Sequence, residues 1–330
     1  MTVSTLSTRL LRSRTSARDV LSARVLAVGP VAAIATVGLA VLTGATAQSP
    51  DVPAWVPWVA LASLAVGLPH GAVDHLALLR PIRHRGLAVA LYLVSAATAV
   101  AVILLLPGPA FVAVVVMSAW HFGTGDVESL VDLGGDQRDT RTWSALHAVA
   151  AGAVPLVLPL TSHATAATLG LVQPQLPHLD GLANGSLRLA TALLALVVVA
   201  RLLTLRRLRP ATELLVLVVL GLLVTPLLAF GVYFALWHAL RHTARLAQDD
   251  TGALNTRSLL LIVAAGLPAL VLTVTIVAVA LLVVGGFGGP GPWLWVTLAL
   301  VWGLTVPHMA VVSRFNAARR SASRPTPRLT

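Results

Sequence analysis

The sequence contains no cysteine and no lysine, and only 11% of its 330 residues are charged. Without cysteine the chain can form no disulfide bond, bind no metal through a thiolate and use no cysteine nucleophile. Soluble domains carry about 25% charged residues, so the low charge argues against a soluble protein. Hydrophobic residues make up 57% of the chain, and runs such as 87–106 and 259–284 are long enough to cross a bilayer. We therefore predict an all-α polytopic integral membrane protein.

Apolar segments follow one another from Val25 to Val312 without a long polar gap, which predicts a bundle of about 8–10 transmembrane helices. A continuous helix over 211–246 would be about 54 Å long, against a hydrocarbon core of about 30 Å, so we expect two spans separated at Pro226. We expect a basic N-terminal segment at 1–24, a transmembrane domain at 25–313 and a basic, disordered tail at 314–330. The predicted spans are 25–44, 54–79, 86–106, 109–125, 143–160, 186–204, 211–225, 227–246, 258–284 and 292–313.

The distribution of arginine predicts the orientation of these spans. If the N-terminus is cytoplasmic and ten spans alternate, every one of the 23 basic residues except Arg188 falls on the cytoplasmic side. An excess of positive charge in cytoplasmic loops is the rule for multi-pass membrane proteins. We therefore expect a multi-pass protein of the cell membrane with both termini in the cytoplasm. Arginine in the cytoplasmic loops accounts for the net charge of +11. We therefore expect no nucleic-acid partner.

Histidines inside the predicted spans form the candidate site. In the segment 67–75, His70 and Asp74 are four residues apart and share a helix face, and His75 follows directly. Asp74 could orient a metal-binding histidine by accepting its second N–H. A second group places His121 five residues before Asp126.

A third group, at 237–242, contains His238 and His242, whose spacing lets one helix supply two ligands to one metal. His308 forms a fourth, weaker group. In the predicted topology His70, His121 and these three histidines fall at one depth, in the cytoplasmic halves of parallel helices. Polar groups are costly inside a membrane and usually functional, so the pattern predicts a metal site. The alternative for each histidine is a hydrogen bond to a neighbouring backbone, and we interpret His84, His147, His163 and His178 as structural or solvated.

The residue types do not decide which metal is bound. Imidazole ligands suit iron, zinc, copper and nickel. Four histidines without a carboxylate would leave room for O2 on Fe(II), whereas three histidines and a water on zinc would suit hydrolysis.

The segments 67–75, 121–126 and 238–242 resemble, in the same order, the motifs of the Brp/Blh family of β-carotene 15,15′-dioxygenases, and the resemblance extends from about residue 67 to 314. It implies cleavage of the central double bond of β-carotene with O2, giving two molecules of all-trans-retinal. It also implies an Fe(2+) cofactor held by His70, His121, His238 and His242. His308 matches a late family motif without an assigned role, and we expect it, Asp74, Asp126 and His75 to add to or support the ligand set.

The resemblance implies β-carotene and O2 as substrates, the lipid bilayer as surroundings and a retinal-binding rhodopsin as acceptor of the product. Because β-carotene dissolves in the bilayer, a site between helices can receive it laterally. We expect an apolar tunnel there, with ordinary helix packing as the alternative interpretation of its aromatic residues. The candidate tunnel residues are Trp120, Phe122, Phe234 and Trp237.

Two other functions fit parts of the pattern. A di-iron membrane desaturase or hydroxylase also uses closely spaced histidines, although this chain has few candidate ligands for two irons and no adjacent histidine pair. A transporter could use Asp74 and the histidines as a proton path. Metal content separates the three hypotheses: one iron per chain for the dioxygenase, two for the desaturase and none for the transporter.

Overall fold

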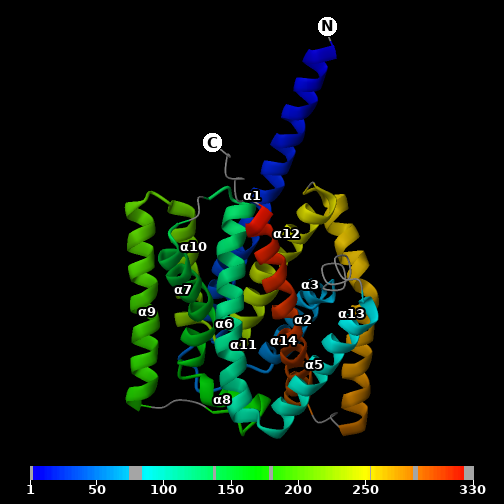
Figure 1. Cartoon of the computed structure of the whole chain (residues 1–330). Coiled ribbons are helices and arrows are strands. Elements are labelled where there is room, and N and C mark those ends of the chain that lie inside the picture. The colour runs from blue at the N-terminus through cyan, green and yellow to red at the C-terminus, as the bar shows by residue number, and fades with distance from the viewer. Residues whose placement is uncertain are drawn as a thin grey trace.

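The computed structural model is all-helical, and it describes residues 3–73, 84–136, 139–177, 181–252, 254–284 and 289–322. Figure 1 shows the helices as an upright bundle from which α1 projects at the N-terminal end. In chain order the elements are α1 (Val3–Thr43), α2 (Val56–Gly67), α3 (Pro69–Ala72), α5 (Arg85–Leu105), α6 (Pro107–Asp132), α7 (Arg141–Leu160), α8 (Thr165–Val172), α9 (Gly181–Thr204), α10 (Leu208–Leu223), α11 (Pro226–Val232), the π-helix η1 (Tyr233–Ala239), α12 (Leu240–Thr251), α13 (Thr256–Val284) and α14 (Pro290–Ala322).

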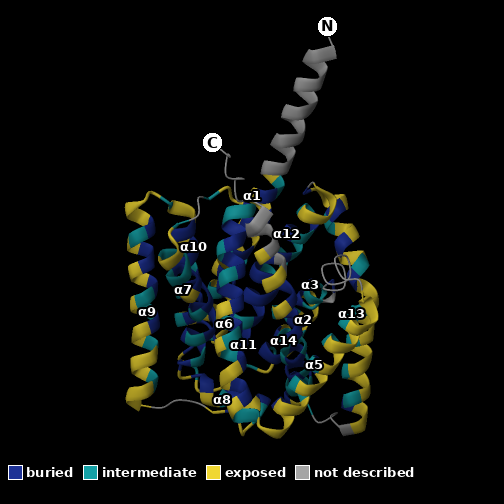
Figure 2. Ribbon diagram, viewed as in Figure 1, coloured by how far each residue is buried: buried dark blue, intermediate teal, exposed yellow. Residues whose placement is uncertain are grey.

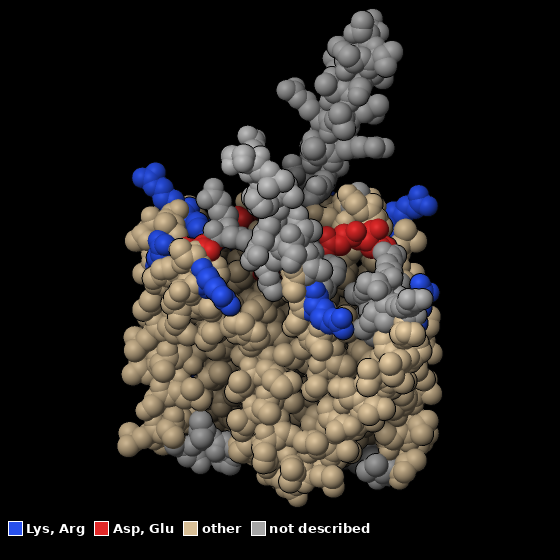
Figure 3. Space-filling model, in the orientation of Figure 1, with Lys and Arg blue, Asp and Glu red and all other residues tan. Residues whose placement is uncertain are grey.

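Within the described residues, seven segments are long and apolar enough to cross a membrane: Val20–Thr43, Arg85–Leu105, Pro107–Asp132, Arg141–Leu160, Gly181–Thr204, Thr256–Val283 and Pro290–Arg314. Outer helices such as α9 and α13 expose apolar side chains, while the centre of the bundle is buried (Figure 2). Charged side chains gather near the end from which the N-terminus projects (Figure 3). The prediction of an all-α, multi-span membrane protein is confirmed. The other three predicted spans correspond to shorter helices: α2 with α3, α10, and the series α11, η1 and α12.

The predicted break at Pro226 is confirmed. The residue Val224, which follows α10, has an extended backbone, and Pro226 begins α11, where its missing N–H is not needed for the helical hydrogen-bond pattern. Val224 forms an isolated β-bridge with Thr46, just beyond the end of α1. The end of α1 and the connection between α10 and α11 therefore lie together at one end of the bundle.

The first helix is part of the packed bundle. The Leu26 carbonyl accepts a hydrogen bond of 2.9 Å from Arg241 of α12, and Gly29 lies so close to Trp237 of η1 that a Cβ there would be 2.7 Å from the indole ring. Three expected boundaries differ in the structure. Helix α1 begins at Val3, α14 continues to Ala322, and the short helix α8 lies between α7 and α9, where no span was predicted.

Helices α6 and α7 contact each other directly through their backbones. A Cβ on Gly123 would lie 1.7 Å from the Ala148 carbonyl oxygen, and a Cβ on Gly152 would lie 1.7 Å from the Ala119 carbonyl oxygen. Only glycine allows this approach, because real Cβ contacts are never so short. The contact fixes the rotation of α6 and hence the direction in which its polar side chains point.

Candidate metal centre and adjoining cavity

Five histidines from five helical elements meet in the middle of the bundle. They are His70 of α3, His121 of α6, His238 of η1, His242 of α12 and His308 of α14. Their neighbouring ring centroids are separated by distances from 5.0 Å, between His121 and His308, to 6.3 Å, between His238 and His242. His70 lies 5.2 Å from His308 and 5.7 Å from both His238 and His242. Each of the five is at most 7% exposed.

The spacing of the rings is that of ligands to one metal. Two imidazoles bound to a single ion through bonds of about 2.1 Å have ring centroids roughly 4.5 to 6.5 Å apart, depending on the coordination angle. As they stand, however, the described His, Asp and Glu side chains include no group of three or more arranged to hold a metal ion. Binding would therefore require the rings to turn toward a common centre. The donor set fits a metal with imidazole ligands.

The hydrogen bonds of the rings indicate which nitrogens are available. His70 Nδ1 donates to the Gly67 carbonyl, which assigns the proton to Nδ1 and leaves Nε2 as a donor atom for a metal. Among the described residues, His121 Nε2 and both ring nitrogens of His238 have no hydrogen-bond partner. A buried nitrogen atom rarely lacks a hydrogen-bond partner in a native protein, and a bound ion is one explanation.

A π-helix positions His238. In an α-helix residues five apart point about 140° away from each other, but the i to i+5 hydrogen bonds of a π-helix place them on one face. In η1, Tyr233 and His238 are five residues apart, and both reach Asp126 of α6. The Tyr233 hydroxyl donates to Asp126 Oδ2 at 2.8 Å, and His238 Nδ1 lies 3.7 Å from Asp126 Oδ1. Sequence reasoning did not identify Tyr233, since it assumed α-helical spacing throughout this segment.

Glycine and phenylalanine complete the packing around the rings. Phe122 lies 4.5 Å from His238 and Phe234 lies 5.2 Å from His70, measured between ring centroids. A Cβ at Gly67 would lie 2.2 Å from the Phe234 ring, so the glycine three residues before His70 makes room for this phenylalanine. These contacts surround the imidazoles with apolar rings.

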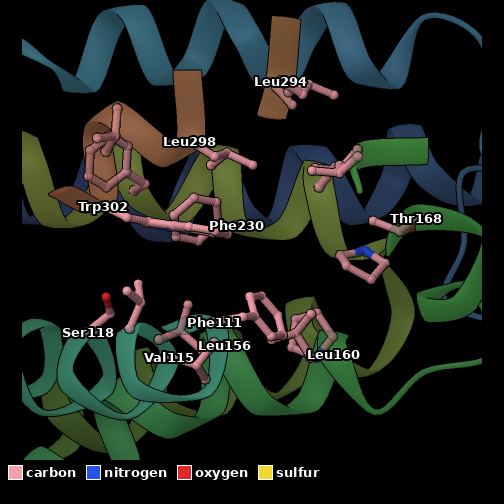
Figure 4. Close-up of a pocket in the computed structure, with 18 of the residues that line it drawn as sticks. Phe111, Val115, Ser118, Leu156, Leu160, Thr168, Phe230, Leu294, Leu298 and Trp302 are labelled. Atoms are coloured by element: carbon pink, nitrogen blue, oxygen red, sulfur yellow. The ribbon is translucent and has the colours of Figure 1, made fainter. Parts of the chain in front are cut away.

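An apolar cavity adjoins the histidines. Phe122 and Phe234 line it and also contact the imidazoles of His238 and His70, so they form the boundary between the two. Figure 4 shows the cavity as elongated, with Ser118 and Trp302 near one end and Thr168 and Leu160 near the other. The remaining wall is mainly leucine, valine and proline, contributed by α2, α6, α7, α8, α11 and α14.

Two of the four aromatic residues predicted to line a tunnel lie elsewhere. Trp120 is 51% exposed on the outer surface of α6. Trp237 is buried beneath Arg241, whose guanidinium carbon lies 4.5 Å from the indole centroid. Neither residue lines the cavity. We therefore retain only Phe122 and Phe234 as candidate substrate contacts.

The remaining candidate histidines and Asp74 either lie away from the cluster or lie outside the described residues. Asp74, His75 and His178 lie outside the described residues. His147 is buried, but it lines a different, polar cavity together with Arg201 and Arg207. His84 and His163 are exposed.

Known proteins resemble the chain over the region that builds this centre. A family model described as beta-carotene 15,15′-dioxygenase matches residues 61–316. The "Probable beta-carotene 15,15′-dioxygenase Blh" of Halobacterium salinarum (strain ATCC 700922 / JCM 11081 / NRC-1) is 34% identical over 257 residues, which cover 71% of this chain and 73% of that protein. No solved structure matches significantly. The family match includes all five clustered histidines.

Proposed function

Because the chain belongs to the β-carotene 15,15′-dioxygenase family and is an enzyme of that family, we propose that it cleaves the central double bond of β-carotene with O2. The products are two molecules of all-trans-retinal. The reaction adds one oxygen atom to each half of the polyene and transfers no proton, so it requires no general acid or base from the protein.

The observation that carries this proposal is the contact between the apolar cavity and the histidine cluster. β-Carotene is a hydrocarbon, so it is bound by burial of apolar surface rather than by hydrogen bonds. The elongated, largely aliphatic cavity suits one half of such a polyene (Figure 4). With that half in the cavity, the middle of the substrate lies at Phe122 and Phe234, next to the imidazoles of His238 and His70.

The proposed cofactor is Fe(2+), held by His70, His121, His238 and His242, with His308 in contact with three of these rings. When bound, the iron would supply the activation of O2. The protein supplies neutral nitrogen donors and a dry site: the five histidines are buried, and Phe122 and Phe234 cover them on the cavity side. Asp126 faces His238, with its Oδ1 atom 3.7 Å from His238 Nδ1.

The surroundings proposed for the enzyme follow from its surface. We place it in the cell membrane as a multi-pass protein with both termini in the cytoplasm. The charged side chains gather at one end of the bundle, and we assign this end to the cytoplasmic side (Figure 3). A substrate dissolved in the bilayer can then reach the cavity between helices. A retinal-binding rhodopsin is the proposed acceptor of the product.

Expression in cells that make β-carotene tests the proposal. The wild-type chain is expected to bleach the orange colour and to leave retinal in the extract, whereas His238→Ala abolishes both effects. His147→Ala is the matched control, because it removes a buried histidine outside the cluster. Persistent orange colour in well-expressing, iron-loaded cells would refute the proposal. Metal analysis of the purified protein is expected to give one iron per chain, and two irons would favour a di-iron hydroxylase instead.

A further inference from the structure

Asp126 of α6 lies between two side chains of η1. Its Oδ2 atom accepts the hydrogen bond from Tyr233, and its Oδ1 atom faces His238 Nδ1. All three residues are buried, with exposed fractions of 3% or less. Building on the proposed function, we propose that Asp126 and Tyr233 are a positioning pair, which keeps the proton of His238 on Nδ1 and so presents Nε2 to the iron.

The tyrosine determines how the carboxylate is oriented. A carboxylate has two oxygens, and a buried one is free to turn unless its hydrogen bonds hold it. The 2.8 Å hydrogen bond from Tyr233 occupies Oδ2, which leaves Oδ1 directed at His238. The distance of 3.7 Å from His238 Nδ1 to Oδ1 would have to shorten by about 0.8 Å to reach a normal hydrogen bond. A small rotation of the imidazole or of the carboxylate would provide this.

Neighbouring residues exclude water from the pair and let His238 pack closely against α6. The Phe122 ring lies 4.5 Å from His238 and 5.7 Å from Tyr233, and so covers both contacts with the carboxylate. A Cβ at Gly125 would lie 3.0 Å from His238 Cε1, so the absence of a side chain there lets the imidazole approach α6 closely. A charged hydrogen bond is stronger in such a dry environment than in water.

His70 shows the same arrangement, in which one ring nitrogen faces a protein acceptor and the other stays available to a metal. His70 also uses Nδ1 for a protein acceptor, in that case the Gly67 carbonyl. His238 Nε2 lies on the ring edge away from Asp126 and has no hydrogen-bond partner among the described residues. A histidine that binds a metal through one nitrogen usually donates its other N–H to a carboxylate or carbonyl, which fixes the tautomer.

The test compares Asp126→Asn, Tyr233→Phe and the double variant in the purified full-length chain. Affinity for Fe(II) is measured by anaerobic competition with a chelator, and the ligand field by the absorption spectrum of the Co(II)-loaded protein. Asp126→Asn is expected to weaken Fe(II) binding by about 10- to 100-fold, because the amide can donate to Nδ1 and favour the wrong tautomer. Tyr233→Phe should weaken it by a smaller factor and shift the Co(II) spectrum in the same direction.

The double variant provides the decisive comparison. If Tyr233 acts through Asp126, adding Tyr233→Phe to Asp126→Asn causes no further loss. Tyr92→Phe and Asp139→Asn are controls for the same substitutions away from the site, and they should leave metal affinity unchanged. Additive losses, or wild-type affinity and spectrum in Asp126→Asn, would overturn the proposal. If Asp126→Asn does not fold, Tyr233→Phe provides the test, because it preserves the buried ring. Unchanged affinity and spectrum in that variant would overturn the proposal.

The result can be separated from the proposed function. A wild-type chain that binds iron and shows these losses in the variants, but forms no retinal, would refute the function and support the pair. Retinal formation by an Asp126→Asn variant with unchanged iron affinity would refute the pair and support the function.

Discussion

Arg241, which lies between the clustered histidines His238 and His242, donates a hydrogen bond of 2.9 Å to the carbonyl oxygen of Leu26 in the first helix. The same guanidinium forms a 2.9 Å ion pair with Glu213 of α10 and lies over the ring of Trp237. Arg241 is only 1% exposed. One buried side chain thus connects α1 and α10 to the helical segment that carries two of the five histidines.

Removal of the Glu213 carboxylate should be costly. Glu213→Ala leaves the buried Arg241 without its counter-charge, and loss of one partner of a buried ion pair typically costs about 3–5 kcal/mol. Denaturant unfolding of the detergent-solubilised protein should show this loss. Asp139→Ala is the control, because its ion pairs with Arg201 and Arg207 are longer and partly exposed and should contribute about 0–1 kcal/mol. Equal losses in the two variants would contradict this interpretation.

Two glycines of α1 should respond in opposite ways to alanine. Gly29→Ala places a Cβ 2.7 Å from the Trp237 ring, and such overpacking should destabilise the fold by about 1–3 kcal/mol. A Cβ at Gly38 meets nothing within 4 Å, so Gly38→Ala should be neutral or stabilising by up to about 1 kcal/mol, as expected in a helix interior. Thermal unfolding measures both changes. A Gly29→Ala variant as stable as the wild type would show that Trp237 can move without cost.

His308 should matter to metal binding although the family resemblance assigns it no ligand role. Its ring lies 5.2 Å from His70, 5.0 Å from His121 and 5.5 Å from His242. Whether His308 binds the metal or supports a ligand, His308→Ala should lower Fe(II) affinity by about tenfold or more. Iron retained after dialysis against a chelator checks this expectation, with His147→Ala as the control. Full iron retention in His308→Ala would place the residue outside the functional site.

The cavity can be tested by filling it. Val115 lines the cavity (Figure 4), whereas the next residue, Val116, is 65% exposed on the outside of the same helix. Val115→Trp should lower kcat/KM for β-carotene by about tenfold or more, which corresponds to about 1.4 kcal/mol of lost transition-state stabilisation. Val116→Trp should leave kcat/KM nearly unchanged. Iron content should stay at the wild-type level in both variants, and equal activity of the two variants would argue against substrate binding in this cavity.

The helical, membrane-spanning character of the chain could be predicted because it depends on local properties. Long apolar runs, a charge content of 11% and proline at segment starts act over one helix at a time, and the break at Pro226 follows from the same kind of local rule. The candidate histidines could be named for a related reason, since a polar side chain within an apolar run is conspicuous wherever the helix packs.

Only the tertiary structure decided how these residues meet. Trp120 and Phe122 flank His121 in the sequence, yet one faces outward and the other lines the cavity. Residues two apart on a helix point about 160° away from each other, and packing selects the buried face. A π-helix brings Tyr233 and His238 to Asp126. Sequence patterns are interpreted with the α-helical repeat, which does not hold in a π-helix. The sequence by itself determined the candidate residues. Helix packing decided which of them share one centre, because the grouping of five histidines depends on contacts between helices far apart in the chain.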